Sequence, residues 1–236
     1  LKSECVKGKV SIRHPVHVQS ISPVDNQWKL QTDHGIELTR AVVMATGGLP
    51  VPAIGASAYS LDIAKQFGLT VIEPRPALVP LAFTAETFGN LSDLAGLSTP
   101  VHISSGSKGD RYGACHFNED ILLTHKGLSG PAVLQASSYW AEGEPIQINW
   151  LGVMGHPGGI DCDALFDHEE NRLKLTESIL ASVLPQRLAR AFAEQKNLQG
   201  RKWVEVSKKD RQAFKEMLTK WTVKPAGTLG WKKAEV

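Results

Sequence analysis

The alternation of apolar and polar residues over positions 7–45 is the first clear pattern of the chain. Apolar residues recur at every second position, as at Val10 and Ile12, and turn-forming residues at positions 23–26 and 33–35 separate the runs. A period of two interrupted by such turns is typical of neighbouring strands. This stretch therefore predicts a β-meander.

A run of five apolar residues, Ala41 to Ala45, follows the meander and leads into Thr46-Gly47-Gly48. Such a run is typical of a strand covered on both faces, as in a parallel sheet flanked by helices. Glycines after the strand allow a sharp turn and the close approach of a ligand, at the edge where open α/β sheets bind nucleotides. A core strand followed by an ordinary turn explains the same residues.

Between positions 57 and 67 the apolar residues recur every three residues, which predicts a helix. Ser57 can cap its start, and Gly68 can end it in a left-handed conformation. Positions 69–72 then predict a short strand. Prolines fix the backbone and cannot donate to a strand ladder, so the exit from this domain is marked by the prolines at positions 74, 76 and 80.

Positions 78–151 have the strand lengths and turn spacing of a small barrel or sandwich. Gly127-Leu-Ser129-Gly-Pro131 has the form of a turn that starts a helix, where free amides would favour an anion or a substrate carbonyl. Simple helix initiation explains these residues equally well. The short strands expected in this part are 79–84, 101–104, 114–117, 121–124 and 146–151.

Positions 161–221 predict three amphipathic helices that bury one another. Pro185 starts the second helix, and Ser207 starts the third in a capping-box-like sequence. Because the helices cover each other, we interpret the aromatic and methionine stripe of the third as core rather than as a cofactor site; it comprises Ala213, Phe214, Met217, Leu218 and Trp221.

Composition adds limits to this picture. The chain has 236 residues, of which 42% are hydrophobic, and 26 basic and 24 acidic residues give a net charge of +2. The near-balanced charge requires neither a nucleic acid nor an anionic membrane as partner. The three cysteines are widely spaced, and no apolar run reaches the roughly 20 residues of a membrane span. We therefore expect a cytoplasmic protein with no membrane partner and no nucleic-acid partner, in an oligomeric state that the sequence does not specify.

Two further motifs have ordinary explanations. Gly106-Ser-Lys-Gly109 matches the Gly-x-x-Gly loop of some RNA-binding modules, but its flanking residues favour a hairpin loop. The segment 156–163 and the pair Asp167-His168 carry side chains that can bind metals, without the close pairings usual in zinc sites. We interpret the segment as a polar linker and predict no metal site.

Several blocks of the chain, in this order, together resemble the BaiN/YhiN-like flavoproteins, a family of FAD-dependent oxidoreductases. The Gly-Leu-Ser-Gly-Pro block is the most specific of them. One departure is Gly55-Ala-Ser-Ala-Tyr59-Ser, where relatives usually carry a Gly-Ser/Thr-Gly-Asp-Gly-Tyr-like run. The blocks are Ala45-Thr46-Gly47-Gly48, Gly55-Ala-Ser57, Leu61-Asp-Ile-Ala-Lys65, Pro74-Arg-Pro76-Ala-Leu-Val-Pro80-Leu81, Leu123-Thr-His125-Lys-Gly127-Leu-Ser129-Gly-Pro131-Ala-Val-Leu134 and Gly227-Thr-Leu-Gly230-Trp-Lys-Lys-Ala234-Glu-Val236.

The resemblance implies an α/β plus α+β fold with inserted domains. It divides the chain into a partial FAD/NAD(P)-binding domain (1–77), a β-barrel-like insert (78–155), a helical insert (156–222) and a strand returning toward the first domains (223–236). The chain contains no Gly-x-Gly-x-x-Gly fingerprint, which relatives carry upstream. We therefore interpret it as an internal fragment that lacks the C-terminal part as well, and expect it to be inactive and nearly free of FAD by itself.

The resemblance also suggests site residues. Val18 would contact adenine through its backbone, although a core strand position explains it too, and the FAD contacts would continue at Ala45, Thr46, Gly47 and Gly48. Gly127, Ser129 and Gly130 would lie on the substrate side. The catalytic residues stay unassigned. His125 is a weak candidate that could hydrogen-bond a substrate carbonyl, and a hydrogen bond to neighbouring backbone is the simpler role for it.

Two functions follow from the resemblance. The first is flavin-mediated hydride transfer to or from a small organic substrate, such as an enone or steroid-like ketone, with NADH or NADPH as electron donor. The alternative is an RNA-interacting module of a tRNA-modifying-type flavoprotein. Its basic face would include Trp203, although interspersed acidic residues weaken it; its cations are Arg201, Lys202, Lys208, Lys209 and Arg211.

Overall fold

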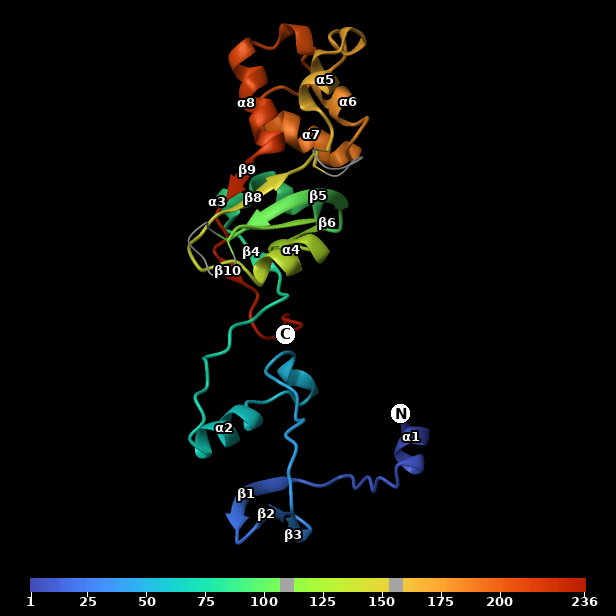
Figure 1. Ribbon diagram of the computed structural model, residues 1–236. Coiled ribbons are helices and arrows are strands. Elements are labelled where there is room, and N and C mark those ends of the chain that lie inside the picture. Colours follow the sequence, from blue (N-terminus) through green and yellow to red (C-terminus); the bar gives the residue numbers. More distant parts are fainter. Residues whose placement is uncertain (107–112, 153–158) are drawn as a thin grey trace. The chain divides into compact units, whose positions relative to one another are not determined.

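The computed structural model describes residues 1–106, 113–152 and 159–236. The chain divides into two compact units (Figure 1). Unit 1 comprises residues 1–48 and 57–72, and unit 2 comprises residues 49–56 and 73–236.

Unit 1 contains a three-stranded antiparallel sheet and two helices. The strands β1 (Val18–Val24), β2 (Gln27–Thr32) and β3 (Gly35–Thr39) follow one another in the order β1-β2-β3, which confirms the predicted meander over residues 18–39. Residues 10–17 form no strand, and Val10 and Ile12 are exposed. The helices are α1 (Lys2–Lys7) and α2 (Tyr59–Gln66), and Gly68 after α2 has the left-handed φ of 71° expected there.

The apolar run Ala41–Ala45 is not a strand, and that prediction is wrong. Its backbone follows β3 without regular structure, and the side chain of Val43 is 87% exposed. Residues 69–72 also form no strand, and Ile72 is 88% exposed. A strand needs a neighbouring strand to take its main-chain hydrogen bonds. Within the described ranges no strand pairs with either run.

Unit 2 is built on a seven-stranded antiparallel sheet of order β10-β4-β7-β6-β5-β8-β9. Helix α4 (Pro131–Ser137) packs against β5 and β6 with Ala132, Val133 and Ala136 buried. The described part of the chain is thus a mixed α/β structure with antiparallel sheets. The strands are β4 (Leu81–Ala82), β5 (Ser98–Ser105), β6 (Cys115–Thr124), β7 (Gly127–Ser129), β8 (Ile146–Asn149), β9 (Trp221–Val223) and β10 (Gly227–Thr228).

Short helices fill the remaining part of unit 2. Phe166, Trp203 and Phe214 form an aromatic cluster with ring centroids 4.5–6.2 Å apart. Of the predicted stripe, Phe214, Met217 and Leu218 are core, whereas Ala213 is exposed. Trp221 opens β9 instead of ending the last helix. The elements are η1 (Pro52–Ile54), α3 (Ala85–Phe88), η2 (Gly89–Leu94), α5 (Cys162–Asp167), η3 (Glu169–Asn171), α6 (Thr176–Leu180), α7 (Gln186–Gln195), η4 (Trp203–Glu205) and α8 (Lys208–Thr219).

The end of the chain is not one strand over residues 223–236, because only Val223, the last residue of β9, and β10 (Gly227–Thr228) are in strands there. A turn at residues 231–233 is followed by irregular backbone, although Ala234 is buried. The amide of Ala77 donates to the carbonyl of Val236 at 2.9 Å, and that of Glu235 to Leu78 at 3.2 Å. These bonds place the end of the chain beside residues 77–78, without a ladder long enough to form a strand. In the residues described, no helix has the length and apolar character needed to cross a membrane.

Candidate functional site

The predicted cofactor turn, Ala45 to Gly48, lies on the surface of unit 1. All four residues are exposed, and Gly47 has a left-handed φ of 76°. A Cβ built on Gly47 would meet no atom within 4 Å. The glycine is therefore required by the backbone conformation rather than by packing, and the space around the turn is open to a ligand.

Val18 begins β1 and pairs with Thr32 of β2, next to an irregularity in the ladder. It lines a hollow of about 500 Å³ in unit 1, together with Leu30. At the same hollow, Arg13 Nη1 lies 2.6 Å from Glu37 Oε1. This hydrogen bond raises the pKa of Arg13 and lowers the pKa of Glu37. The volume is within the range of small-molecule sites.

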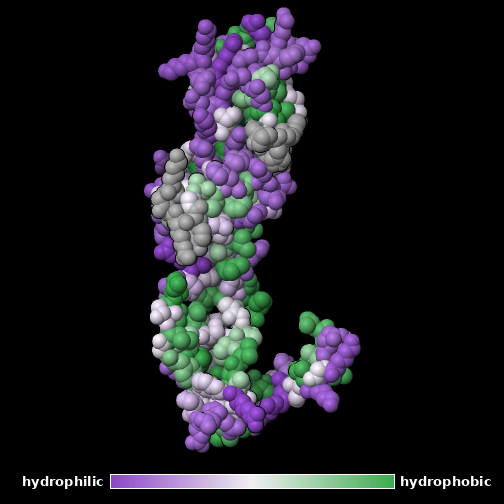
Figure 2. All heavy atoms as spheres, in the orientation of Figure 1, coloured by the Kyte–Doolittle hydropathy of each residue, from purple (hydrophilic) through white to green (hydrophobic). Residues whose placement is uncertain are grey.

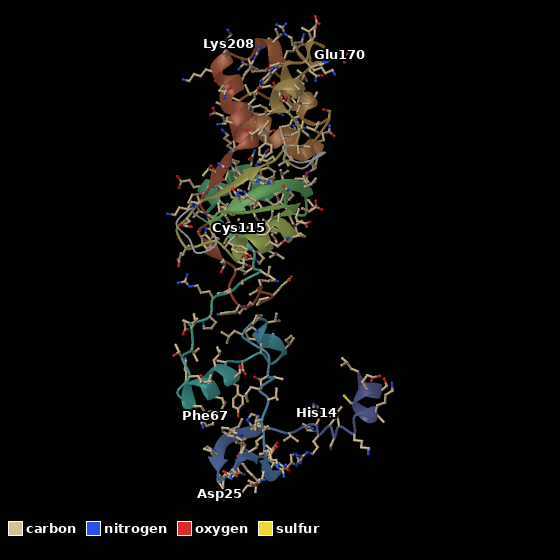
Figure 3. All side chains as sticks on the ribbon, in the orientation of Figure 1. His14, Asp25, Phe67, Cys115, Glu170 and Lys208 are labelled. Carbon is tan, nitrogen blue, oxygen red and sulfur yellow. The ribbon has the colours of Figure 1, made fainter. Side chains whose placement is uncertain are left out.

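A second hollow of unit 1, of about 420 Å³, is mainly apolar. Trp28 and Phe67, which Figure 3 labels at the end of α2, meet edge to face with ring centroids 5.2 Å apart. Met44, from the run before the glycine turn, lines the same hollow. Figure 2 shows hydrophobic residues gathered at the visible surface over α2. The apolar residues of unit 1 thus remain accessible.

The Gly-Leu-Ser-Gly-Pro block forms strand β7 and the start of helix α4 in unit 2. Gly127 begins β7, and a Cβ there would lie 2.2 Å from the carbonyl oxygen of Leu81 on β4. Gly130, the residue before α4, has a φ of 88°, and its Cβ would lie 2.7 Å from the carbonyl oxygen of Asp120. Close packing between backbones therefore requires both glycines. Roles of Gly127, Ser129 and Gly130 toward a substrate stay a prediction.

His125 is exposed in the two-residue turn between β6 and β7. The turn is held by Thr124, whose hydroxyl donates to the carbonyl of Gly127 at 2.9 Å. The hydroxyl of Thr124, rather than the imidazole, thus holds this turn, and a catalytic role of His125 also stays a prediction.

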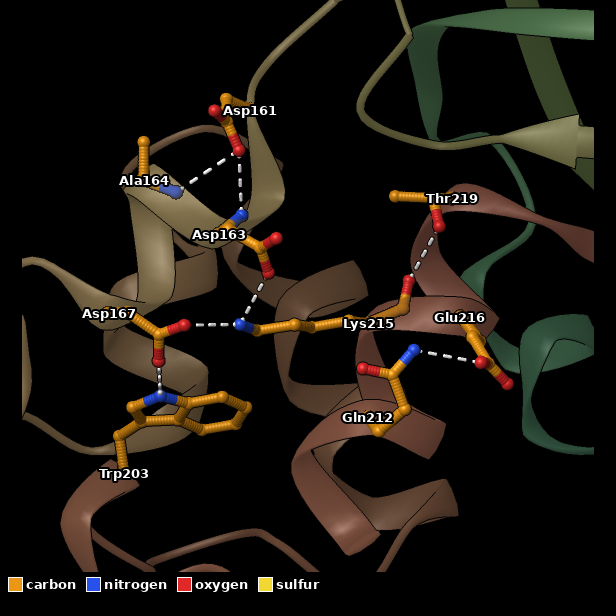
Figure 4. Close-up of polar contacts among 9 residues, drawn as sticks. All are labelled: Asp161, Asp163, Ala164, Asp167, Trp203, Gln212, Lys215, Glu216 and Thr219. Atoms are coloured by element: carbon orange, nitrogen blue, oxygen red, sulfur yellow. Dashed lines mark hydrogen bonds and ion pairs between the residues drawn. The ribbon is translucent and has the colours of Figure 1, made fainter. Parts of the chain in front are cut away.

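The aspartates predicted as possible metal-binding side chains, Asp163 and Asp167, bind a lysine of another helix. Lys215 of α8 is 12% exposed and donates to both Asp163 and Asp167 of α5, the former at 2.7 Å (Figure 4). Asp167 also accepts from the indole Nε1 of Trp203 at 3.2 Å. These bonds join α5, η4 and α8. His156 lies outside the described residues.

The pKa values in this cluster follow from those bonds. Burial raises the pKa of Asp167, but the hydrogen bonds from Lys215 and Trp203 outweigh it, so the pKa lies below the usual value. Burial lowers the pKa of Lys215, and its two aspartate partners outweigh that effect and raise the pKa. Burial raises the pKa of the neighbouring Cys162 thiol to about 12, so this cysteine is protonated and a poor nucleophile at neutral pH. The cluster is suited to holding helices together.

The basic face that includes Trp203 is not formed as predicted. Trp203 is 0% exposed, because its indole lies in the aromatic core, and it cannot stack on a nucleobase. Arg211 lies over the same ring, 5.3 Å from its centroid, and donates to the carbonyl of Val206. Arg201 donates to the carbonyl of Glu205. Both arginines therefore contribute to the fold of this region.

Sequence reasoning missed a polar face on the sheet of unit 2. His102 of β5 lies opposite Asn118 of β6, and Ser104 lies opposite His116. Alternation in residues 98–105 carried a signal for it, since polar and buried residues alternate along β5. The Gly106-Ser-Lys-Gly109 motif begins with Gly106, at a φ of 84° after this strand, and its other residues lie outside the described ranges.

Comparison with known proteins adds two findings. Residues 75–236 match the family described as HI0933-like protein barrel and H2TH domain. The whole chain is 34% identical to the ribosomal RNA dihydrouridine synthase of Escherichia coli (strain K12), of which it covers 56%. It is 32% identical to the ribosomal RNA dihydrouridine synthase of Haemophilus influenzae (strain ATCC 51907 / DSM 11121 / KW20 / Rd), of which it covers 57%. The chain thus spans a little over half the length of these relatives.

These relatives correct the prediction that nucleic acid is not a partner. Both are named for an activity on ribosomal RNA, and that prediction is wrong. The physical reason is that a net charge near zero describes the whole chain, whereas binding depends on how charges are placed on one surface. The match over residues 75–236 covers more than half of the chain. The chain therefore belongs to the HI0933-like family, whose barrel and H2TH domain is formed by residues 75–236.

Proposed function

We propose that the full-length protein is a flavin-dependent enzyme that reduces a uridine of RNA to dihydrouridine. The observation that carries this proposal is identity along the entire chain, 34% and 32%, to two enzymes named ribosomal RNA dihydrouridine synthases. This chemistry replaces the small organic substrate as the leading hypothesis. The resemblance to BaiN/YhiN-like flavoproteins supports FAD as the cofactor.

The reaction adds a hydride and a proton across the C5–C6 double bond of uracil. A bound reduced flavin supplies hydride chemistry that amino-acid side chains lack, and NADH or NADPH would restore its electrons. The protein must hold the uracil ring against the cofactor, exclude water and deliver the proton. His125, exposed beside the Gly-Leu-Ser-Gly-Pro block, is our proposed candidate for a hydrogen bond to the substrate.

Two features of unit 1 fit a dinucleotide. The hollow lined by Val18 has about 500 Å³, and the turn at Gly47 has no atom within 4 Å of a built Cβ. Backbone amides without side chains in front of them can approach a phosphate or a ring closely. We propose that Val18 and the turn Ala45–Gly48 contact the cofactor, and that its pyrophosphate is held elsewhere, because the chain has no Gly-x-Gly-x-x-Gly loop.

The direct test uses purified full-length protein, NADPH and ribosomal RNA from cells that lack the corresponding gene. After digestion, mass spectrometry of the nucleosides is expected to show one uridine that has gained two hydrogens. Flavin absorbance of the purified protein should bleach on addition of NADPH and return with RNA. Protein that reduces enones with NADPH but leaves every uridine unchanged would overturn the proposal in favour of the small-substrate hypothesis.

The proposed cofactor turn has its own test with a matched control. Gly47→Ala and Gly68→Ala both place a side chain at a left-handed glycine, with φ of 76° and 71°, and neither new Cβ meets an atom within 4 Å. The backbone strain is therefore alike. We expect Gly47→Ala to lower the flavin content of the full-length protein and Gly68→Ala to leave it unchanged. Equal flavin content in both would remove the turn from the cofactor site.

A further inference from the structure

The register of the sheet in unit 2 gathers polar side chains on one face. Ser104 lies opposite both His116 and Gln147, and Gln147 lies opposite Thr222. His102 lies opposite Asn118 and Asn149 in the next row. Residues directly opposite one another in antiparallel strands point to the same face. We name this the outer sheet face; it comprises His102, Ser104, His116, Asn118, Gln147, Asn149 and Thr222.

The other face of the same strands is closed by the core. Val101, Ile103, Ile121 and Ile148 alternate with the residues above and are fully buried, and α4 packs on this side of β5 and β6. On the outer sheet face, in contrast, His116, Asn118, Gln147 and Thr222 are exposed and the other members are half-buried. The polar groups are thus not needed to fill an interior.

Two imidazole rings lie stacked on this face. The ring centroids of His102 and His116 are 5.3 Å apart and their planes differ by 19°. Nδ1 of His102 lies 2.7 Å from Oδ1 of Asn118, which fixes the orientation of the first ring. The ring of His116 is exposed on one side and packs against the ring of His102 on the other. An exposed flat ring held in this way can stack on a nucleobase.

The charge at the β9 edge of this surface favours an anion. Strands β5, β8 and β9 contain no aspartate or glutamate. Lys220 and Lys224 are exposed and flank β9, two residues on either side of Thr222. The carboxylates of β6, Glu119 and Asp120, lie in the middle of that strand. Asp120 is exposed on the same face, opposite Pro100 and one row beyond Asn118, and β5 and β8 separate its strand from β9. Cations therefore border one edge of a face that carries flat rings and amide groups.

The combination of flat rings, amides and bordering lysines matches one kind of partner. Single-stranded RNA is recognised by stacking of unpaired bases on flat side chains, by hydrogen bonds to base edges and by cations along the backbone. The helical part of unit 2 offers less, because Trp203 is buried and Lys208 and Lys209 precede Asp210. In Figure 3, Lys208 marks that helical part and Cys115 the start of β6.

We propose that the outer sheet face binds an unpaired segment of the RNA substrate, with a base stacked on His116 and phosphates near Lys220 and Lys224. This proposal rests on the proposed function, from which it takes RNA as the substrate. It adds the surface of unit 2 that binds the RNA. Gln147 is exposed and presents an amide group that can meet a base edge. A duplex keeps its bases paired and stacked, so it binds this face more weakly.

The test measures binding of a fluorescein-labelled single-stranded oligouridine to the full-length protein by anisotropy, over a series of salt concentrations. His116→Ala is expected to weaken binding about tenfold, and His116→Tyr, which keeps a flat ring, to stay within about twofold of the wild type. Lys220→Ala with Lys224→Ala is expected to reduce the slope of log Kd against log salt by about 1.4, from about 0.7 for each of two phosphate contacts.

The matched control is Lys208→Ala with Lys209→Ala, which removes two exposed lysines from α8 and should leave the salt slope unchanged. A loss of slope in this control, with Lys220→Ala and Lys224→Ala unaffected, would place the RNA on α8 and overturn the proposal. Unchanged binding by both His116 variants would overturn the stacking role.

Measuring uridine reduction by the wild type and the same variants distinguishes failure of the proposed RNA-binding surface from failure of the proposed function. If the wild type reduces RNA and the sheet variants bind and react like it, the surface is wrong and the function stands. If the wild type binds RNA through this face without reducing it, the function is wrong and the surface stands. A wild type that binds no RNA contradicts both.

Discussion

The two units of the chain treat similar apolar sequences in opposite ways. In unit 2 the apolar residues of β5 and β6 form a closed core, in which Ile103 and Ile121 are 0% exposed. In unit 1 only Ile21 and Ile63 are buried among the described hydrophobic residues. Its exposed large hydrophobic residues are Leu1, Val6, Val10, Ile12, Val16, Val24, Ile36, Leu38, Val43, Phe67, Leu69 and Ile72.

The difference shows what an apolar run predicts. In unit 2 each inner strand has two neighbours and α4 covers one face, so the sheet supplies its own burial. In unit 1 the meander has three strands, and none of the described strands joins the run Ala41–Ala45. A hydrophobic pattern states a preference for burial, whereas the pairing partner decides whether a strand forms.

Hydrogen exchange gives the largest expected contrast between the units. The amides of residues 41–45 are not paired with any described strand, whereas those of residues 121–124 lie in the paired strand β6. We therefore expect the amides of residues 41–45 to exchange at least about a thousandfold faster than those of residues 121–124. Deuterium uptake of peptides covering the two ranges measures this. Equal protection would show that the run is hydrogen-bonded.

A pair of isoleucine variants tests the same contrast by stability. Ile103→Ala should lower the free energy of unfolding of unit 2 by about 2–5 kcal/mol, since it leaves a cavity in a closed core. Ile72→Ala makes the same chemical change at an exposed side chain and should stay within about 0.5 kcal/mol. Urea denaturation followed by tryptophan fluorescence measures both, and a similar loss in the two variants would contradict the comparison.

Much of the fold was accessible from local patterns. The meander, helix α2 and the buried stripe Phe214, Met217 and Leu218 depend on residues close in sequence, and the structure confirms them. The order β10-β4-β7-β6-β5-β8-β9 joins strands more than a hundred residues apart. Local periodicity does not specify such pairings, and for the same reason it did not show that residues 41–45 lack a partner.

In the candidate site, too, features that depend on local sequence could be predicted, and features that depend on strand pairing could not. The left-handed Gly47 and the exposed turn could be predicted from two adjacent glycines, because their conformational freedom is local. The outer sheet face could not, because His102 and Gln147 share it only through pairing of β5 with β8. Trp203 was misplaced because a tryptophan beside lysines has the same local sequence whether its ring points into solvent or into a core.

Two glycine variants extend the comparison to the backbone. Gly127→Ala would place a Cβ 2.2 Å from the carbonyl oxygen of Leu81 at a φ of 149°. We expect a loss of about 2 kcal/mol or more from the stability of unit 2, since backbone must move. Gly47→Ala meets no atom and should cost about 1 kcal/mol from its left-handed φ alone. Thermal unfolding measures both, and a neutral Gly127→Ala would refute the packing explanation of the block.

The smallest effect is expected at Lys215, the polar link within the closed unit. Lys215→Met keeps the buried stem but removes the bonds to Asp163 and Asp167. Half of the Asp167 side chain is exposed, so solvent screening limits the expected loss to about 1 kcal/mol. Lys209→Met on the same helix is the control, since Lys209 is exposed and should give no change.

The pH dependence of that loss follows from the directions of the pKa shifts. The lowered pKa of Asp167 stabilises the fold above its unfolded value of about 3.9, and this contribution disappears as pH falls through the folded value. The raised pKa of Lys215 stabilises below about 10.4, and this contribution disappears as pH rises through the folded value. The difference between wild type and Lys215→Met should therefore be greatest between about pH 4 and pH 10 and shrink on either side. A difference that is constant from pH 2 to about pH 8 would mean that the lysine acts through the packing of its stem rather than through its charge.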